Sequence, residues 1–346
     1  MAHRAGSLDK VDRLVARIGF GPWTLSEVVG TGWTRSEVRA AVAAGRLVRL
    51  RRGVFAAGRD DALARSRAAL LVSGERAALS HESAAAVHGM WVPSSSPVVH
   101  ITAPGIPDSL HEGTRNHGSR LPDELVTTVD GVRVTTLART AVDLARRRSF
   151  PDALIALDGG ARLICLRELG GTCADLRNVA RRAPLASRAL ELLHTAYGSV
   201  LGWPGTAVVR RALPHADPAS ESPFESLSRG WIPEAGLPAP AVAVLVHGAS
   251  GATYYADLAW LDRGVLGEAD GTSKYGTDPS VVRSRLRDER RRQRDLEDAG
   301  WTVVRWDSTE ARQTVVTRIR HALATPRRES LPEWSSTRPG QRPFGQ

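Results

Sequence analysis

The sequence is poor in the features that mark secreted and membrane proteins. Its 346 residues contain only two cysteines, Cys165 and Cys173, which are too few for a disulfide framework and too isolated for a zinc or redox motif. The N-terminus has no apolar run of signal-peptide length, and no run approaches the roughly 18 apolar residues that a membrane span needs. We therefore expect a soluble, cytoplasmic protein whose thiols are reduced.

Lysine is also scarce. Of the 47 basic residues only Lys10 and Lys274 are lysines, so arginine carries almost all of the positive charge. The 37 acidic residues leave a formal net charge of +10, and this excess favours a polyanionic partner such as DNA. A lysine that persists in so arginine-rich a chain is a candidate for a role that requires an amine.

Residues 1–58 have the pattern of three short helices followed by a hairpin. The segment from Leu8, "LDKVDRLVARIG", carries apolar residues at helical spacing. Two T-x-x-E capping boxes, at Thr24 and Thr34, open two more helices. The alternating run "RLVRLRRGVFAAG", with a turn at Gly53, suits a β-hairpin. This order of elements predicts a winged helix-turn-helix.

In such a module the third helix enters the major groove of DNA and the hairpin contacts the backbone. Residues 1–58 hold ten Lys or Arg against four acidic residues, a net charge of +6. The alternative is that the arginines of the third helix are solvated and that the module packs against a neighbouring domain. The candidate DNA-binding residues are Arg35, Arg39, Arg46, Arg49, Arg51 and Arg52.

Residues 59–215 read as a mostly helical, mixed α/β adaptor. Two β-like patches, "PVVHITAPG" and "LVTTVDGVRVTTLA", interrupt it, and "VDGV" in the second is a hairpin turn signal. Helices are expected at about 138–147 and 186–197. His81 and His88 are spaced too widely for the H-E-x-x-H arrangement of a zinc site. We therefore expect His81 to cap or pack, and no recognisable chemistry in this region.

Two stretches carry a resemblance to a known family. "GRLVRLRRGVFAAG" followed by "ALSHESAAAVHGMW" resembles the AbiEi-type antitoxins of abortive-infection systems. The likeness is specific over residues 5–60 and loose through about residue 200. It implies binding to a promoter, repression of the protein's own operon and a cognate toxin as partner. It does not imply catalysis.

The C-terminal third predicts the element order αβββαβ. Its three first strands are "PAVAVLVHG", "TYYADLAWL" and "GVLGEADG", and helical patterns precede and follow them. The short turn "LDRG" joins the second strand to the third, so Asp257 and Glu268 lie near one another across an antiparallel pair. Alternation sends Glu268 and Asp270 to one face of the sheet, and the small residues Gly267 and Ala269 to the other.

Carboxylates in a half-buried sheet repel one another and are costly to desolvate. A divalent cation would remove this conflict. Mg²⁺ (or Mn²⁺) favours one or two carboxylates together with waters and phosphate oxygens, and such an ion activates water and polarises a phosphodiester. We therefore predict Asp257 and Glu268 as metal ligands.

The element order and the "D…E-x-D-G" spacing resemble the PD-(D/E)XK nuclease superfamily, in the branch close to very-short-patch-repair endonucleases. The likeness covers about residues 218–310. It implies Mg²⁺-dependent hydrolysis of DNA, in phage defence or DNA repair. The positions that match the family's acidic residues are Glu225, Asp257 and Glu268.

One departure from the family pattern concerns its lysine. Asp270 occupies the expected position, and Lys274, four residues on, is the candidate to stabilise charge on the phosphate; Glu225 or Asp270 would help to orient the metal or its water. Each residue has an alternative. In these alternatives Glu225 completes a helix cap, and Asp257 and Glu268 are relics of a nuclease fold now used for DNA or protein contact. Lys274 would then be a surface-loop residue. The arginines of "RSRLRDERRRQRD" form a solvated helix face.

The sequence as a whole predicts a multidomain α+β or α/β protein. Its parts are a winged helix (1–58), the adaptor (59–215), a restriction-endonuclease-like αβββαβ core (216–324) and a disordered tail (325–346) rich in Pro, Ser and Arg. We expect the chain from about Ala216 to fold alone. Two functions stay open: a DNA endonuclease, and a non-enzymatic antitoxin or repressor with a degenerate nuclease fold.

Overall fold

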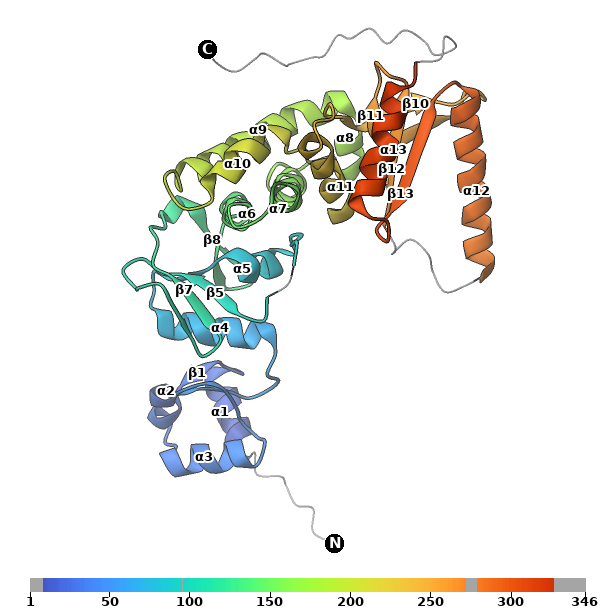
Figure 1. Cartoon of the computed structure of the whole chain (residues 1–346). Helices are drawn as coiled ribbons and strands as arrows, with labels where there is room; N and C mark the ends of the chain where they lie inside the picture. The colour runs from blue at the N-terminus through green and yellow to red at the C-terminus, as the bar shows by residue number, and fades with distance from the viewer. Residues whose placement is uncertain (1–8, 95, 272–278, 327–346) are drawn as a thin grey trace. The chain divides into compact units, whose positions relative to one another are not determined.

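The computed structural model describes residues 9–94, 96–271 and 279–326 (Figure 1). Lys274 and almost all of the tail expected at 325–346 lie outside these residues. The described residues form a mixed α/β structure, about half helical, with three β-sheets. The chain divides into two compact units, residues 1–144 and 145–346, so the adaptor expected at 59–215 contributes to both. The four-part division stays a prediction.

The first part of the N-terminal unit contains the expected three helices and hairpin. Thr24 and Thr34 cap the second and third helices, and both predicted capping boxes are present. Trp23, Trp33 and Phe55 help to fill the core between these elements. A two-residue strand that was not predicted adds to the hairpin. The elements are α1 (Lys10–Ile18), β1 (Trp23–Thr24), α2 (Leu25–Gly30), α3 (Arg35–Ala43), β2 (Val48–Arg51) and β3 (Val54–Ala56), with strand order β1-β3-β2.

The rest of this unit is built on a six-stranded sheet of order β6-β7-β5-β4-β9-β8. Asp130 and Gly131 have positive φ angles of 48° and 73°, as the predicted hairpin turn between β8 and β9 requires. The sheet is larger than the two β-like patches predicted, because it also contains β4, β6 and β7. The elements are α4 (Ala62–Ser73), β4 (Ala78–Leu79), α5 (His81–His88), β5 (Val99–Thr102), β6 (Ser109–His111), β7 (Thr114–His117), β8 (Val126–Val129), β9 (Val132–Thr135) and α6 (Leu137–Ala145).

The C-terminal unit begins with helices and ends with a four-stranded sheet. The order αβββαβ predicted from the sequence is present, and α13 follows it. Strands β10, β11 and β12 are antiparallel, whereas β12 and β13 are parallel. The elements are α7 (Phe150–Leu163), α8 (Cys173–Arg177), α9 (Val179–Gly198), α10 (Thr206–Ala212), α11 (Pro223–Glu234), β10 (Ala241–His247), β11 (Thr253–Trp260), β12 (Val265–Asp270), α12 (Pro279–Asp298), β13 (Thr302–Asp307) and α13 (Arg312–Ala324).

Helices cover both faces of this sheet (Figure 1). Helices α11 and α13 share a core with Leu258 and Trp306, and α12 packs on the other face through Leu296. The predicted placement of small residues on the first face is confirmed for Gly267. A Cβ at that position would lie 2.9 Å from the Trp306 ring, so a larger residue would push the ring away from β12.

Helix α7 packs closely against α11. Asp158 of α7 and Arg229 of α11 form a buried ion pair at 2.5 Å. A Cβ at Gly230 would lie 2.5 Å from the Cα of Pro151, so the two helix backbones approach very closely. A chain that began at Ala216 would lose α7, and we therefore no longer expect it to fold alone.

Two smaller expectations concern membranes and thiols. None of the described helices is both long enough and apolar enough to cross a membrane. Cys165 and Cys173 are free thiols in the structure, and burial raises the pKa of Cys165 to about 11, which makes this thiol a poor nucleophile.

Candidate functional site

Three acidic residues approach one another beside the two inner strands, β11 and β12, of the C-terminal sheet. The register that pairs Leu258 with Gly267 places Asp257 and Glu268 at the next rung of the β11–β12 pair, as the sequence predicted. Asp257 Oδ2 accepts a hydrogen bond from the Ala269 N–H at 2.9 Å. Glu225, in the first turn of α11, joins Asp257 in lining an open pocket of about 340 Å³, and the other side chains of that pocket include Arg177, Glu221, Tyr254, Tyr255 and Arg292.

The pKa shifts indicate that the three carboxyl groups share one electrostatic environment. Burial, with a further contribution from the charge of Asp257, raises the pKa of Glu225 to about 7. Burial and Asp257 likewise raise the pKa of Glu268 to about 8, although Arg292 and Arg305 oppose the shift. Because Asp257 acts on both glutamates, the site disfavours three negative charges at once.

Two arginines that sequence reasoning missed compensate this acidic cluster. Arg292 Nη2 donates to Glu268 Oε1 at 2.8 Å and to the Tyr255 carbonyl at 2.5 Å. Arg305 Nε lies 3.5 Å from Asp270 Oδ2. The interpretation of the α12 arginines as a solvated face is wrong for Arg292, because this side chain reaches the sheet. Guanidinium groups therefore supply part of the positive charge that we assigned to a metal ion.

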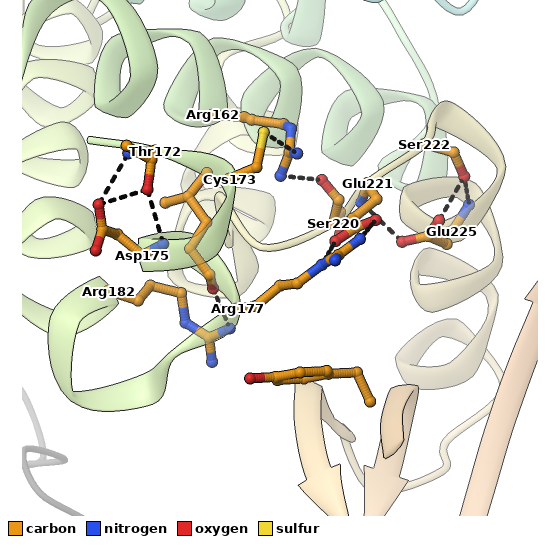
Figure 2. A network of polar contacts seen from close by, with 12 residues as sticks. Arg162, Thr172, Cys173, Asp175, Arg177, Arg182, Ser220, Glu221, Ser222 and Glu225 are labelled. Atoms are coloured by element: carbon orange, nitrogen blue, oxygen red, sulfur yellow. Dashed lines mark hydrogen bonds and ion pairs between the residues drawn. The ribbon is translucent and has the colours of Figure 1, made fainter. Parts of the chain in front are cut away.

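Glu225 also has the structural role that was its alternative (Figure 2). Its Oε1 accepts from the Ser222 hydroxyl at 2.9 Å, and its Oε2 accepts from the Glu221 N–H at 2.7 Å. Ser222 in turn caps α11 by accepting from the Glu225 N–H. The side chain of Glu221 forms a two-pronged ion pair with Arg177 of α8, at 2.5 and 2.8 Å. The cap fixes the Glu225 carboxylate in place, and a ligand role would use its remaining lone pairs.

The acidic cluster lacks the closeness of a preformed three-residue metal site. The oxygens of Glu225, Asp257 and Glu268 do not all lie within 4.8 Å of one another, and among the described residues that spacing is met by a group of histidines instead. Metal binding by the acids would therefore use two of them or a small movement of side chains.

The six arginines predicted to bind DNA fall into two groups. Arg35, Arg39, Arg49 and Arg52 are exposed and have no carboxylate partner among the described residues. Arg46 is exposed but pairs with Asp9. Arg51 is half-buried, because its guanidinium lies 3.8 Å from Glu112 and 3.4 Å from the Thr114 hydroxyl. We therefore treat only these four arginines as available for phosphate contacts; Arg39 and Arg49 make only long side-chain hydrogen bonds, at 3.4 Å, to backbone carbonyls.

Lys10, one of the two lysines, has a partner inside the N-terminal module. Its Nζ lies 2.6 Å from Glu37 Oε1, and this hydrogen bond helps to lower the pKa of Glu37 to about 2. The pairing with Glu37 gives the lysine at position 10 a structural role. Lys274 lies outside the described residues.

The middle of the chain contains a cluster that the sequence did not predict. His81 at the start of α5, His100 in β5 and His117 in β7 bring their rings together. His88 contacts the Thr135 carbonyl oxygen instead, at 2.7 Å. No short sequence motif predicts the cluster, because its members come from three elements. The signal that the sequence did offer was histidine on neighbouring short strands.

Comparisons with known proteins place these features in context. Residues 68–195 match the AbiEi antitoxin C-terminal domain. Two Mycobacterium tuberculosis proteins, the uncharacterized proteins MT2308 (strain CDC 1551) and Rv2248 (strain H37Rv), are each 30% identical over 276 residues, which cover 78% of this chain and 89% of theirs. The crystal structure of the RV2827C protein from the same species is 17% identical with a TM-score of 0.34, over 59% of this chain and 79% of that one.

Proposed function

Since the chain belongs to the family of the M. tuberculosis proteins MT2308 and Rv2248 and contains an AbiEi antitoxin C-terminal domain, we propose that it is a DNA-binding protein with metal-dependent endonuclease activity. The antitoxin domain supports a toxin–antitoxin role and a DNA or toxin partner. The grouping of Glu225 and Glu268 around Asp257 in the αβββαβ unit carries the endonuclease part. The proposed fold of this unit is the PD-(D/E)XK core.

The donor set fits a hard divalent cation. Asp257 and Glu268 offer carboxylate oxygens, the ligands that Mg²⁺ and Mn²⁺ prefer. Burial, and after it the charge of Asp257, raises the pKa of Glu268, and a bound cation would offset both effects. When bound, the ion would polarise a phosphodiester and the water that attacks it. Glu225, held by its cap, would orient that water, and Lys274 is the candidate amine for the phosphate. As the metal binds, Arg292 would either keep its hydrogen bond to Glu268 or give it up.

Plasmid cleavage with Asp257→Asn tests this function. We expect the wild type to cut DNA in Mg²⁺ or Mn²⁺ and to gain thermal stability from either ion, since a ligand of the folded state stabilises it. Asp257→Asn should abolish both effects. Asp262→Asn is the matched control, because Asp262 is 80% exposed in the turn that joins β11 to β12, and it should behave as the wild type.

For DNA binding we propose a winged helix made by residues 10–56. The order of its elements supports this assignment, and so do the exposed arginines of helix α3 and of the β2–β3 hairpin. Arg35 and Arg39 lie on α3, whereas Arg49 and Arg52 lie on the hairpin. Four cations on two neighbouring elements match the phosphate contacts that position such a module on DNA.

Replacing Arg39, Arg49 and Arg52 together with alanine should weaken binding to every DNA sequence. Each lost phosphate contact should also reduce the log–log salt slope of the binding constant by about 0.9. Fluorescence anisotropy over a range of salt concentrations measures both quantities. Arg188→Ala, an exposed arginine that pairs with Glu191, is the control; a triple variant with an unchanged slope would contradict the proposed interface.

A non-enzymatic repressor is the second candidate, and the arginine contacts favour it. Arg292 and Arg305 already pair with Glu268 and Asp270, so the acids have cationic partners from the chain itself. This function predicts a wild type indifferent to Mg²⁺ and an Asp257→Ala variant that is markedly less stable, because alanine cannot accept the Ala269 N–H as Asp257 does. Sequence-specific promoter binding without cleavage would then decide for repression.

A further inference from the structure

Three imidazole rings form a compact, largely buried cluster in the N-terminal unit. One ring nitrogen from each of His81, His100 and His117 lies within 4.8 Å of the others. His81 and His117 are 1% and 5% exposed, and His100 is half-buried. The rings of His81 and His117 stack with centroids 4.1 Å apart, and those of His100 and His117 lie 5.3 Å apart. Three imidazoles thus meet in a place largely shielded from water.

The backbone fixes the position of each ring. His100 and His117 project from the same face of the sheet, because β5 and β7 are parallel and Thr102 is paired with His117. Helix α5 is fastened above them, since the Ser80 N–H donates to the His100 carbonyl at 3.0 Å and the His100 N–H donates to Ser83 Oγ at 2.9 Å. The cluster is therefore built into the fold.

The distance between two of the ring nitrogens suits a shared metal ion. His100 Nδ1 and His117 Nε2 are 3.1 Å apart. Two nitrogens bound at about 2.0–2.1 Å to a tetrahedral Zn²⁺ lie about 3.3 Å apart. Without a metal this distance corresponds to one hydrogen bond in which one ring nitrogen donates and the other accepts. The same geometry is thus close to that of two ligands on zinc.

The opposite nitrogens of two rings have the partners that metal-bound histidines require. Glu82 Oε2 lies 3.5 Å from His100 Nε2, and the Ser80 hydroxyl lies 3.0 Å from His81 Nδ1. A histidine ligand usually donates its second N–H to a carboxylate or another oxygen, which fixes its tautomer and orients its ring. These contacts would direct His100 Nδ1 and His81 Nε2 toward the centre of the cluster.

Two further observations point to a bound ligand. His81 has a positive φ of 50°, a backbone region that non-glycine residues seldom adopt and that tends to occur at functional sites. The Thr102 hydroxyl, 1% exposed, has no hydrogen-bond partner among the described residues. It lies on the sheet face that carries His100 and His117, where a metal-bound water would give it a partner.

The geometry points to a binding site for one divalent transition-metal ion, Zn²⁺ in particular, held by His81, His100 and His117 with a water in the fourth position. Imidazole suits zinc and its transition-metal neighbours, whereas Mg²⁺ prefers oxygen ligands. The site is therefore chemically distinct from the carboxylates of the C-terminal unit. Three histidines leave one coordination position open, and the partial exposure of His100 gives it access to solvent.

Metal loading of the full-length protein tests the site. After removal of metal with EDTA, we expect the wild type to bind one equivalent of Zn²⁺ and to gain thermal stability from it. Co²⁺ bound in its place should give the visible absorption of a four-coordinate ion, which Zn²⁺ but not Mg²⁺ displaces. A wild type that takes up neither Zn²⁺ nor Co²⁺ would overturn the proposal, whatever the variants show.

Four variants distinguish the residues that would bind Zn²⁺ from residues that only lie near the site. His100→Gln and His117→Gln should weaken Zn²⁺ binding by more than about 100-fold, beyond the effect of losing a partner of a ligand. Glu82→Gln, which alters such a partner, should weaken it by about 10- to 100-fold. His111→Gln, at an exposed position in β6, should have no effect. Unchanged Zn²⁺ affinity in a His117→Gln protein with the circular dichroism of the wild type would exclude the triad.

Discussion

Asp158→Asn should lower the free energy of unfolding of the C-terminal unit by about 3–5 kcal/mol, the usual cost of removing one partner from a buried ion pair. The Asp158 carboxylate is fully buried and lies 2.5 Å from Arg229. It also accepts from the Asp217 N–H at 2.9 Å and from the Ser220 hydroxyl at 3.2 Å. The substitution would leave the Arg229 charge buried without its counter-ion, and urea denaturation measures the loss.

Two controls show whether the loss comes from the isolated charge. The double variant Asp158→Leu with Arg229→Met should recover much of the stability, because apolar residues of similar volume often replace a buried ion pair at little cost. Glu191→Gln, which breaks an exposed pair with Arg188, should change stability by less than about 1 kcal/mol. A loss below about 1 kcal/mol in Asp158→Asn would mean that Arg229 finds enough compensation elsewhere, for instance from the His215 carbonyl.

Without divalent metal ions, the wild type should lose stability as the pH rises from 5 to 8, and Glu268→Gln should remove most of this dependence. Burial and the charge of Asp257 raise the pKa of Glu268 from 4.5 to about 8. Between these values the folded state holds a proton that the unfolded state has released, so stability falls as the pH rises. The maximum slope for one such group is about 1.4 kcal/mol per pH unit.

Arg292 reduces this effect, because its contact with Glu268 favours the ionised carboxylate. Glu225 acts in the same direction as Glu268, since its pKa is raised to about 7. The informative quantity is therefore the difference between the wild type and Glu268→Gln in urea denaturation at several pH values, with Glu191→Gln as control. Equal slopes in all three proteins would show that Glu268 ionises normally in the folded state.

Local patterns in the sequence were enough to predict many of the elements. The capping boxes at Thr24 and Thr34, the turn at Asp130 and the proximity of Asp257 to Glu268 all depend on residues within one turn or one hairpin. These interactions form between neighbours in the chain, so spacing and residue type specify them. The order αβββαβ in the C-terminal unit could be predicted for the same reason.

Contacts between distant elements could not be predicted in this way. Arg292 reaches Glu268 only because α12 packs on the sheet with this side chain directed toward it. The sequence of α12 by itself is that of a solvated helix. Asp158 meets Arg229 because α7 and α11 pack together. The histidine cluster needs one helix and two short strands at a particular register. In each case the residue type is visible in the sequence, but its partner depends on tertiary packing.

The close contact between Pro151 and Gly230 has a consequence for how such proteins evolve. Any side chain at Gly230 would collide with the backbone of α7, and the ion pair between Asp158 and Arg229 links the same two helices. Substitutions at these four positions are therefore coupled across the two helices. A recombination event that exchanged the C-terminal sheet and α11 between homologues without α7 would separate both pairs. Viable gene fusions should have their junction before Phe150, in the segment that precedes α7.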